Sequence, residues 1–171
     1  MKFKSIALTI VLALSLASCG SNQKKTTTPD NVSADKVQVD NGKNNGINLE
    51  LNGDSDSNKA GSLQTVYFDF NSAALSDATK AALENNAKFL KANPTVKVQV
   101  EGHCDERGGV QFNLALGERR AKGVREYLTG QGVEAARITT ISFGKERPVA
   151  FGHDEEAWSK NRRANFVVIA K

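Results

Sequence analysis

Polar and titratable side chains concentrate in one glycine-rich stretch, residues 101–109, directly after a segment with the pattern of a strand. A loop that leaves the end of a strand exposes side chains and backbone N–H groups together, so this stretch is the candidate site. Zinc binding is disfavoured because His103 and Cys104 are adjacent and no second His/Cys cluster supplies the spacing that zinc sites need. Nucleophilic catalysis by this pair is also disfavoured, because neighbours on an extended chain point to opposite faces.

Asp105 and Arg120 are the groups in this region most suited to binding a ligand. Asp105 lies in the loop, and Arg120 lies fifteen positions later on a predicted helix. A guanidinium grips a carboxylate through two parallel hydrogen bonds, and a carboxylate accepts hydrogen bonds from an ammonium group. Together the two side chains could hold an amino acid by both ends. The same spacing is compatible with a purely structural ion pair between them, or with a role in capping the loop.

The elements that position this pair alternate between strands and helices. Period-two alternation predicts a strand over 96–100, and apolar residues three or four positions apart predict a helix over 114–128. Ser76 is the expected N-cap of an earlier helix, and Asn93 and Pro94 are its expected stop. Further strands are expected at 65–70, 138–143 and 164–169, with a short helix at 154–160. This order predicts an α/β (α+β sandwich) fold with helices packed on one face of a mixed β-sheet.

The beginning of the chain has the composition of an export signal. Lys2 and Lys4 precede an apolar run over 6–16, and small residues lead to Cys19, which predicts a signal peptide over residues 1–18. A cysteine directly after the cleavage site resembles the acylated N-terminus of bacterial lipoproteins. The two residues that follow lack the aspartate that marks inner-membrane retention in enterobacterial lipoproteins. The resemblance therefore implies a lipid anchor in the cell outer membrane, with the protein facing the periplasm.

The mature chain is expected to consist of a linker and one domain. Residues 19–61 are rich in Ser, Asn, Lys, Asp and Gly and are predicted to be the lipidated N-terminus and a flexible linker. Residues 62–171 have the length of a single domain. Removing residues 1–18 takes two lysines from the formal net charge of +4 and leaves +2, which is too small a bias for nucleic-acid binding. Because no nucleotide-binding glycine signature follows a strand, the sequence gives no support for a nucleotide role.

Four stretches of the predicted domain resemble the OmpA C-terminal-like family. They are 66–71, 100–108, Asn113 with 116–121, and 161–164. With a lipoprotein signal in front, the chain is similar to the peptidoglycan-binding lipoproteins of that family. The resemblance implies non-covalent binding of peptidoglycan through the diaminopimelate of its stem peptide, with no catalysis, metal or cofactor.

The same resemblance assigns individual roles at the site. It implies that Asp105 binds the ammonium group of the ligand, that Arg120 binds its carboxylate, and that Phe70 and Asn71 line the site from the loop after the first strand. Family members often carry aspartate where this chain has Asn71. Residues 161–163 are expected at the rim of the site or as solvated surface groups. The family also implies a partner, the periplasmic β-propeller protein of the Tol system, and a role in tethering the outer membrane to the wall and supporting constriction at cell division.

One alternative remains open. A peptidoglycan-processing enzyme would share the loop and use Asp105 or Glu106 as a general base. Such an enzyme needs a second acid, a nucleophile or a metal nearby, and the sequence offers none convincingly. The sequence therefore favours binding and keeps hydrolysis as the competing hypothesis.

Overall fold

The computed structural model describes residues 48–171, so the predicted signal peptide, Cys19 and most of the predicted linker lie outside the described part. Four strands form one mixed sheet in the order β1-β4-β2-β3. Their bounds are Val66–Tyr67 for β1, Lys97–His103 for β2, Ile138–Gly144 for β3 and Arg163–Ala170 for β4. β2 runs parallel to β3 and antiparallel to β4, and β1 pairs antiparallel with β4 at one edge.

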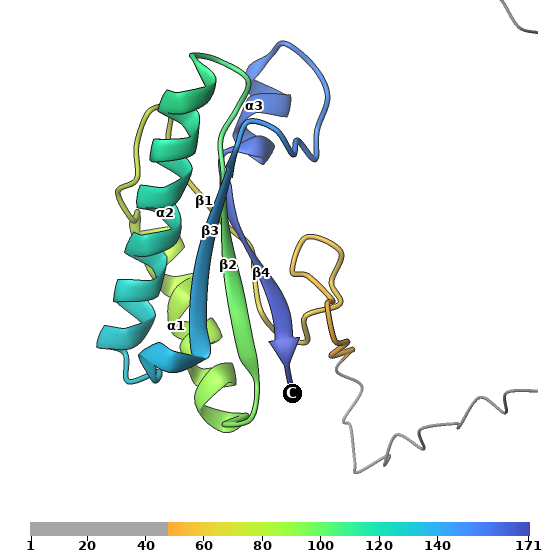
Figure 1. Cartoon of the computed structure of the whole chain (residues 1–171), viewed down its shortest axis with the longest axis vertical. Coiled ribbons are helices and arrows are strands. Elements are labelled where there is room, and N and C mark those ends of the chain that lie inside the picture. Colours follow the sequence, from red (N-terminus) through yellow and green to blue (C-terminus); the bar gives the residue numbers. More distant parts are fainter. Residues whose placement is uncertain (1–47) are drawn as a thin grey trace, which may run out of the picture. The chain divides into compact units, whose positions relative to one another are not determined.

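Two long helices cover one face of this sheet (Figure 1). The two long helices are α1 (Asp77–Ala92) and α2 (Val110–Gly130). A 3-10 turn over Ala135–Arg137 leads into β3, and a short helix, α3 (Glu155–Asn161), lies between β3 and β4. The side chain of Ser76 accepts a hydrogen bond from the N–H of Thr79 at 3.2 Å and is the N-cap of α1, as the sequence predicts. Within residues 48–171, no helix is both long enough and apolar enough to cross a membrane.

The core fills the space between the sheet and the two long helices. Its fully buried members include Val98 and Val100 of β2, Phe166 and Val168 of β4, and Leu83, Leu90, Val124 and Leu128 of the helices. They follow the period of two along the strands and of three or four along the helices that the sequence shows. Burying each side chain of this size stabilises the fold by about 1.5–3 kcal/mol, and this packing fixes α2 against β2.

Two glycines bring α2 close to the end of β2. A Cβ atom at Gly102 would lie 1.9 Å from the carbonyl oxygen of Gly117, and a Cβ atom at Gly117 would lie 2.4 Å from Oγ of Ser142. A side chain at either glycine would therefore force the helix and the strand apart. This close approach places Arg120, three residues further along α2, beside His103 at the end of β2.

Residues 48–61 pair with β4 along the part of its edge that β1 leaves free. The N–H of Asn52 donates to the carbonyl of Val168 at 2.8 Å, and the N–H of Ser55 donates to the carbonyl of Phe166 at 2.9 Å. The structure differs here from the predicted flexible linker, because these residues are folded onto β4 ahead of the predicted domain start at residue 62. Backbone hydrogen bonds carry much of this contact, and they leave no side-chain pattern in the sequence.

β1 is shorter than the predicted strand over 65–70. The chain leaves the sheet after Tyr67 because side chains, rather than a neighbouring strand, satisfy the next carbonyl groups. Thr79 donates from Oγ1 to the carbonyl of Tyr67 at 2.9 Å, and Arg162 donates from Nε to the carbonyl of Phe68 at 3.0 Å. The loop that follows β1 is thereby free to reach the end of β2, where the candidate site lies.

Candidate functional site

A small cavity of about 130 Å³ lies where β2 ends and α2 begins. Its lining includes the four residues that the sequence predicts to contact a ligand, Phe70, Asn71, Asp105 and Arg120. Phe70 and Asn71 come from the loop after β1, Asp105 comes from the loop after β2, and Arg120 comes from α2. The fold thus brings together side chains that are as much as 50 positions apart in the sequence.

Asp105 is a buried carboxylate held by two arginines. Only 3% of the residue is exposed. Arg107 donates to it from Nη2 at 2.7 Å and from Nε at 3.2 Å, and Arg162 donates from Nη1 at 3.3 Å. Burial alone raises the pKa of Asp105, but the hydrogen bonds from Arg107 and Arg162 outweigh burial and hold the pKa below its ordinary value. Asp105 is therefore ionised at neutral pH, and it pairs with these two residues rather than with Arg120.

Arg120 forms part of the cavity lining although none of its surface is accessible to solvent. Its guanidinium donates to the carbonyl oxygens of Asp69 at 3.0 Å, Ser72 at 2.8 Å and His103 at 2.7 Å. Nη1 also donates to Sγ of Cys104 at 3.4 Å. These contacts use four of the five N–H donors of an arginine and leave one N–H on Nη2. Arg120 therefore ties the loop after β1 to the end of β2.

Arg107 closes the outer side of the cavity. Its guanidinium lies between two aromatic rings, 3.9 Å from the ring centroid of Phe70 and 4.0 Å from that of Trp158. These cation–π contacts hold the side chain over Asp105. The side chain of Arg107 keeps 29% of its surface exposed, so a ligand can displace it. The sequence pattern did not assign Arg107 to the site, although an arginine two residues after a loop aspartate is a signal for such a pair.

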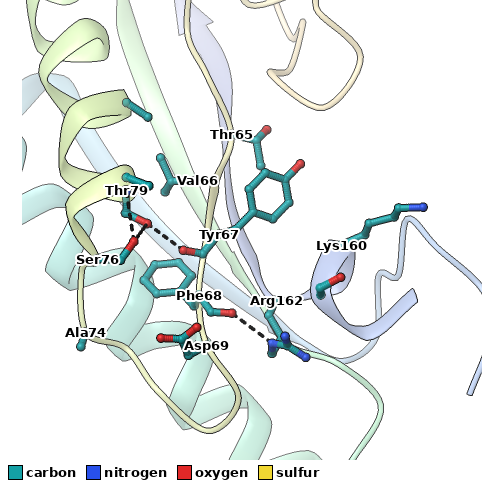
Figure 2. A pocket seen from close by; sticks show the side chains of 13 residues that line it. Thr65, Val66, Tyr67, Phe68, Asp69, Ala74, Ser76, Thr79, Lys160 and Arg162 are labelled. Atoms are coloured by element: carbon teal, nitrogen blue, oxygen red, sulfur yellow. Dashed lines mark hydrogen bonds between the residues drawn. The ribbon is translucent and has the colours of Figure 1, made fainter. Parts of the chain in front are cut away.

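Arg162 forms the inner wall and separates this cavity from a second one of about 430 Å³. Figure 2 shows the second cavity, with Arg162 donating to the carbonyl of Phe68. Arg162 also forms an ion pair with Glu155. Arg163 lies on the other face of the sheet and pairs with Asp56 at 2.8 Å. Because both arginines are less than a tenth exposed, the interpretation of 162 and 163 as solvated surface groups is wrong, and only Arg162 belongs to the site.

The loop between β2 and α2 is held in shape by Asn113. Its side-chain Nδ2 donates to the carbonyl of Arg107 at 2.8 Å and to that of Gly109 at 3.2 Å. Gly108 has a φ of 89°, which a residue with a Cβ adopts only with strain. These features set the direction in which Arg107 and Asp105 leave the loop.

His103 and Cys104 lie on opposite sides of the chain. The thiol of Cys104 donates to the carbonyl of Asn113 at 3.4 Å, and burial raises the pKa of Cys104, so the thiol is neutral at neutral pH. The ring of His103 stacks on Phe143 with the centroids 5.6 Å apart. The two side chains therefore do not form a nucleophile and base. Within residues 48–171, no group of three or more His, Cys, Asp and Glu is placed to hold a metal ion.

The charges around the cavity favour a ligand with a carboxylate. Three guanidinium groups, those of Arg107, Arg120 and Arg162, lie around a single carboxylate, that of Asp105. The arginines attract an anion, while Asp105 offers one position for a cation. This arrangement suits a group that carries both charges close together.

The fold and the cavity define a class of protein: small α/β domains with two helices on one face of a mixed sheet and a charged cavity at the end of a central strand. The profile of the OmpA family matches residues 67–162, which is more than half of the chain, and the chain belongs to the OmpA family. This match confirms the family and the fold class that the sequence predicts.

Individual relatives share much of the chain. A peptidoglycan-associated lipoprotein of Pseudomonas putida is 40% identical over 164 residues, which cover 95% of this chain and 93% of the relative. The peptidoglycan-associated lipoprotein of Pasteurella multocida is 49% identical over 100 residues, 58% of this chain and 67% of the relative. The crystal structure of the peptidoglycan-associated lipoprotein from Burkholderia pseudomallei has 46% identity and a TM-score of 0.59, over 61% of this chain and 88% of that one. The match to the Haemophilus influenzae relative spans 65% of its length, less than two thirds.

Proposed function

We propose that the chain is an outer-membrane lipoprotein that binds peptidoglycan non-covalently and tethers the membrane to the cell wall. The observation that carries this proposal is the cavity in which Phe70, Asn71, Asp105 and Arg120 meet. The names of the relatives support it, since each is called a peptidoglycan-associated lipoprotein. The group bound is the diaminopimelate of the stem peptide, which carries an ammonium and a carboxylate on one carbon.

The two charged groups of the ligand bind at different residues. The ammonium group binds Asp105, which is ionised and therefore ready to accept its hydrogen bonds. It takes the place of Arg107, the more exposed partner of Asp105, while the buried Arg162 stays in contact. The carboxylate binds where guanidinium groups predominate and accepts from the remaining Nη2 N–H of Arg120. Asn71 lies on the cavity lining close enough to add a polar contact.

The remaining parts of the proposal concern the anchor and the partner. Acylation of Cys19 holds the chain in the outer membrane, and the residues that follow it connect the lipid to the folded domain. As the resemblance to lipoproteins of this family implies, the domain exchanges between peptidoglycan and the periplasmic β-propeller protein of the Tol system and supports envelope constriction at division.

The hydrolase alternative is disfavoured by the state of both candidate bases. Asp105 accepts hydrogen bonds from two arginines, and its pKa is lowered. Glu106 accepts from Nε1 of Trp158 at 2.9 Å and contacts His153, and these contacts lower the pKa of Glu106. A general base works best with a pKa near the operating pH, so neither carboxylate is tuned for proton abstraction.

Co-sedimentation of the full chain, purified in detergent, with diaminopimelate-containing sacculi tests the proposal. Asp105→Asn keeps the shape of the side chain and removes the charge that the ammonium group needs. We expect this variant to bind at least tenfold more weakly, because it removes one partner of a buried charge pair. Glu118→Gln is the matched control, since Glu118 is exposed on α2 and pairs with Lys122 of the same helix.

Two outcomes overturn the proposal. If Asp105→Asn and Glu118→Gln both bind sacculi as tightly as the wild type, the charge at residue 105 does not recognise the ligand. If the wild type releases soluble muropeptides from the sacculi, the protein is an enzyme and not a binding protein alone. Circular dichroism spectra of all variants establish that they are equally folded.

A further inference from the structure

The cavity that holds the proposed ligand is the first of three that adjoin one another. The second, of about 430 Å³, shares Arg162 with the first. The third, also of about 430 Å³, shares Thr65, Tyr67 and Lys160 with the second. The three cavities therefore form a row that runs from the end of β2 along the edge strand β1. A row of this kind fits a chain-like ligand better than a single small molecule.

The second cavity is lined by hydroxyl groups and an exposed aromatic ring. Ser76, Thr79 and Ser159 contribute hydroxyl groups. Each of these hydroxyl groups donates a hydrogen bond within the protein, and its oxygen keeps a lone pair that can accept a hydrogen bond from a ligand. Tyr67 is 52% exposed even though it belongs to a strand, and Figure 2 shows its ring between Lys160 on one side and the hydroxyl groups of Ser76 and Thr79 on the other. A tyrosine ring offers a flat apolar face with a polar tip, at a low cost in conformational entropy.

The basic groups of this second cavity are already paired, whereas the carboxylate of Asp69, which also lines the cavity, forms no ion pair within residues 48–171. Arg162 contacts Asp105 and Glu155, and Lys160 contacts Glu156 at 2.9 Å. The lining thus offers hydroxyl groups, one carboxylate and a ring face, but no unpaired cation. A carboxylate accepts hydrogen bonds from the hydroxyl groups of a ligand, so this chemistry fits a polyhydroxyl ligand.

We propose that the second cavity, with Tyr67 as its platform, binds the saccharide backbone of the same polymer whose stem peptide occupies the first cavity. The inference rests on the proposed function, because it takes peptidoglycan as the ligand of the first cavity. Arg162 lines both cavities, so the part of the stem peptide between diaminopimelate and the saccharide would pass this residue. Binding both parts at once raises the affinity for the polymer above that for the isolated peptide.

Affinity measurements with two soluble ligands test this inference on the full chain in detergent. One ligand is the free diaminopimelate-containing stem peptide, and the other is a short glycan chain that carries the same peptide. Tyr67→Ala is expected to weaken binding of the glycan chain about fivefold and to leave binding of the free peptide unchanged. Tyr67→Phe keeps the ring and is expected to retain both affinities. Phe151→Ala is the control, because this ring is 88% exposed and lies outside the second cavity.

Each possible result has a distinct meaning. If Tyr67→Ala weakens the binding of both ligands equally, or changes the binding of neither, the proposal of a saccharide site is overturned. The same holds if the wild type binds the glycan chain no more tightly than the free peptide. If the wild type fails to bind the free peptide, the proposed function itself fails, whatever the glycan chain does. If Tyr67→Ala unfolds at the same temperature as the wild type, loss of the fold is excluded as the cause of weaker binding.

Discussion

Arg120 and Arg137 are both buried, and they lie at opposite ends of β2. Arg120 donates to three backbone carbonyls where β2 ends. Arg137 donates to the carbonyls of Leu90 and Asn93 at 2.8 Å each, and to that of Val96 at 2.9 Å from Nε, just before β2 begins. In both cases these carbonyl dipoles, rather than a carboxylate, receive the hydrogen bonds of the guanidinium. The two residues therefore make the same kind of contact.

Their surroundings differ, and the difference shows what makes a site. Arg137 meets the last carbonyls of α1, where the unpaired C=O groups and the helix dipole favour a cation, and this role accounts for its contacts. Arg120 instead lines a cavity and lies near the ionised Asp105. A buried arginine is thus not in itself evidence of a binding site. A buried donor that lines a cavity, with an opposite charge close by, is such evidence.

Replacing either arginine with methionine is expected to cause a large loss of stability. Each substitution leaves three carbonyl groups, some buried and some partly buried, without their donors, so the free energy of unfolding falls by about 3 kcal/mol in both variants. Urea denaturation followed by circular dichroism measures this loss. At conditions where both variants are folded, only Arg120→Met is expected to lose binding to sacculi. Equal binding by the two variants would remove the functional distinction between the two ends of β2.

Gly102→Ala is expected to disturb the Arg120 end without touching Arg137. The new Cβ would lie 1.9 Å from the carbonyl oxygen of Gly117, so α2 must move, at a cost of about 3 kcal/mol in unfolding free energy. Binding to sacculi is also expected to weaken in this variant, because Arg120 moves with α2. Gly130→Ala is the control, since a Cβ there meets nothing within 4 Å and alanine is the better helix former. A Gly102→Ala variant as stable as the wild type would contradict the close packing described here.

The Arg120 end is also expected to lose stability on acidification, because β2 ends there with the buried His103. Neither ring nitrogen of His103 has a hydrogen-bond partner at normal length, and the nearest acceptor is Oε2 of Glu101, 3.6 Å from Nε2. Burial lowers the pKa of His103 below its ordinary 6.5, Arg163 adds to this effect, and Glu101 and Asp56 oppose it. Below pH 6.5 the unfolded chain therefore binds a proton that the folded chain does not. Stability is full above that pH and falls by up to about 1.4 kcal/mol per pH unit down to the folded pKa.

His103→Leu is expected to flatten this pH dependence, as urea denaturation at a series of pH values measures. His153→Gln is the matched control, because the side chain of His153 is 88% exposed. A hydrogen bond to Glu106 raises the pKa of His153, so its contribution is present below pH 6.5 and is lost as the pH rises, which is the opposite sign. If His103→Leu keeps the wild-type slope, another group is responsible for the acid sensitivity.

Asn71→Asp is expected to have the smallest effect. Asn71 has a φ of 51°, which aspartate also tolerates, so the fold is unchanged. The added carboxylate faces a lining with three arginines and gives the ligand ammonium group a second partner, so sacculus binding strengthens about threefold at low salt. Gln131→Glu adds the same charge beyond the far end of α2 and is expected to leave binding unchanged. An equal gain in both variants would point to a general charge effect.

The elements that depend on local interactions were predictable from the sequence. The cap at Ser76, the end of α1 at Asn93 and the period-two pattern of β2 all follow from contacts between residues close in the chain. The early end of β1 and the folding of residues 48–61 were not predictable in this way. Both depend on carbonyl groups that accept from, or pair with, segments far away in the sequence.

The sequence by itself determined the order of strands and helices around the site, because caps, periodicity and residue type are local properties. Its resemblance to the OmpA family supplied Phe70, Asn71, Asp105 and Arg120, four of the residues that line the cavity. Only the tertiary structure decided how those residues are used. Asp105 pairs with Arg107 and Arg162, while Arg120 gives most of its donors to backbone carbonyls. These partners come together only because Gly102 lets α2 approach β2, and because hydrogen bonds between segments about fifty positions apart hold the loops in place.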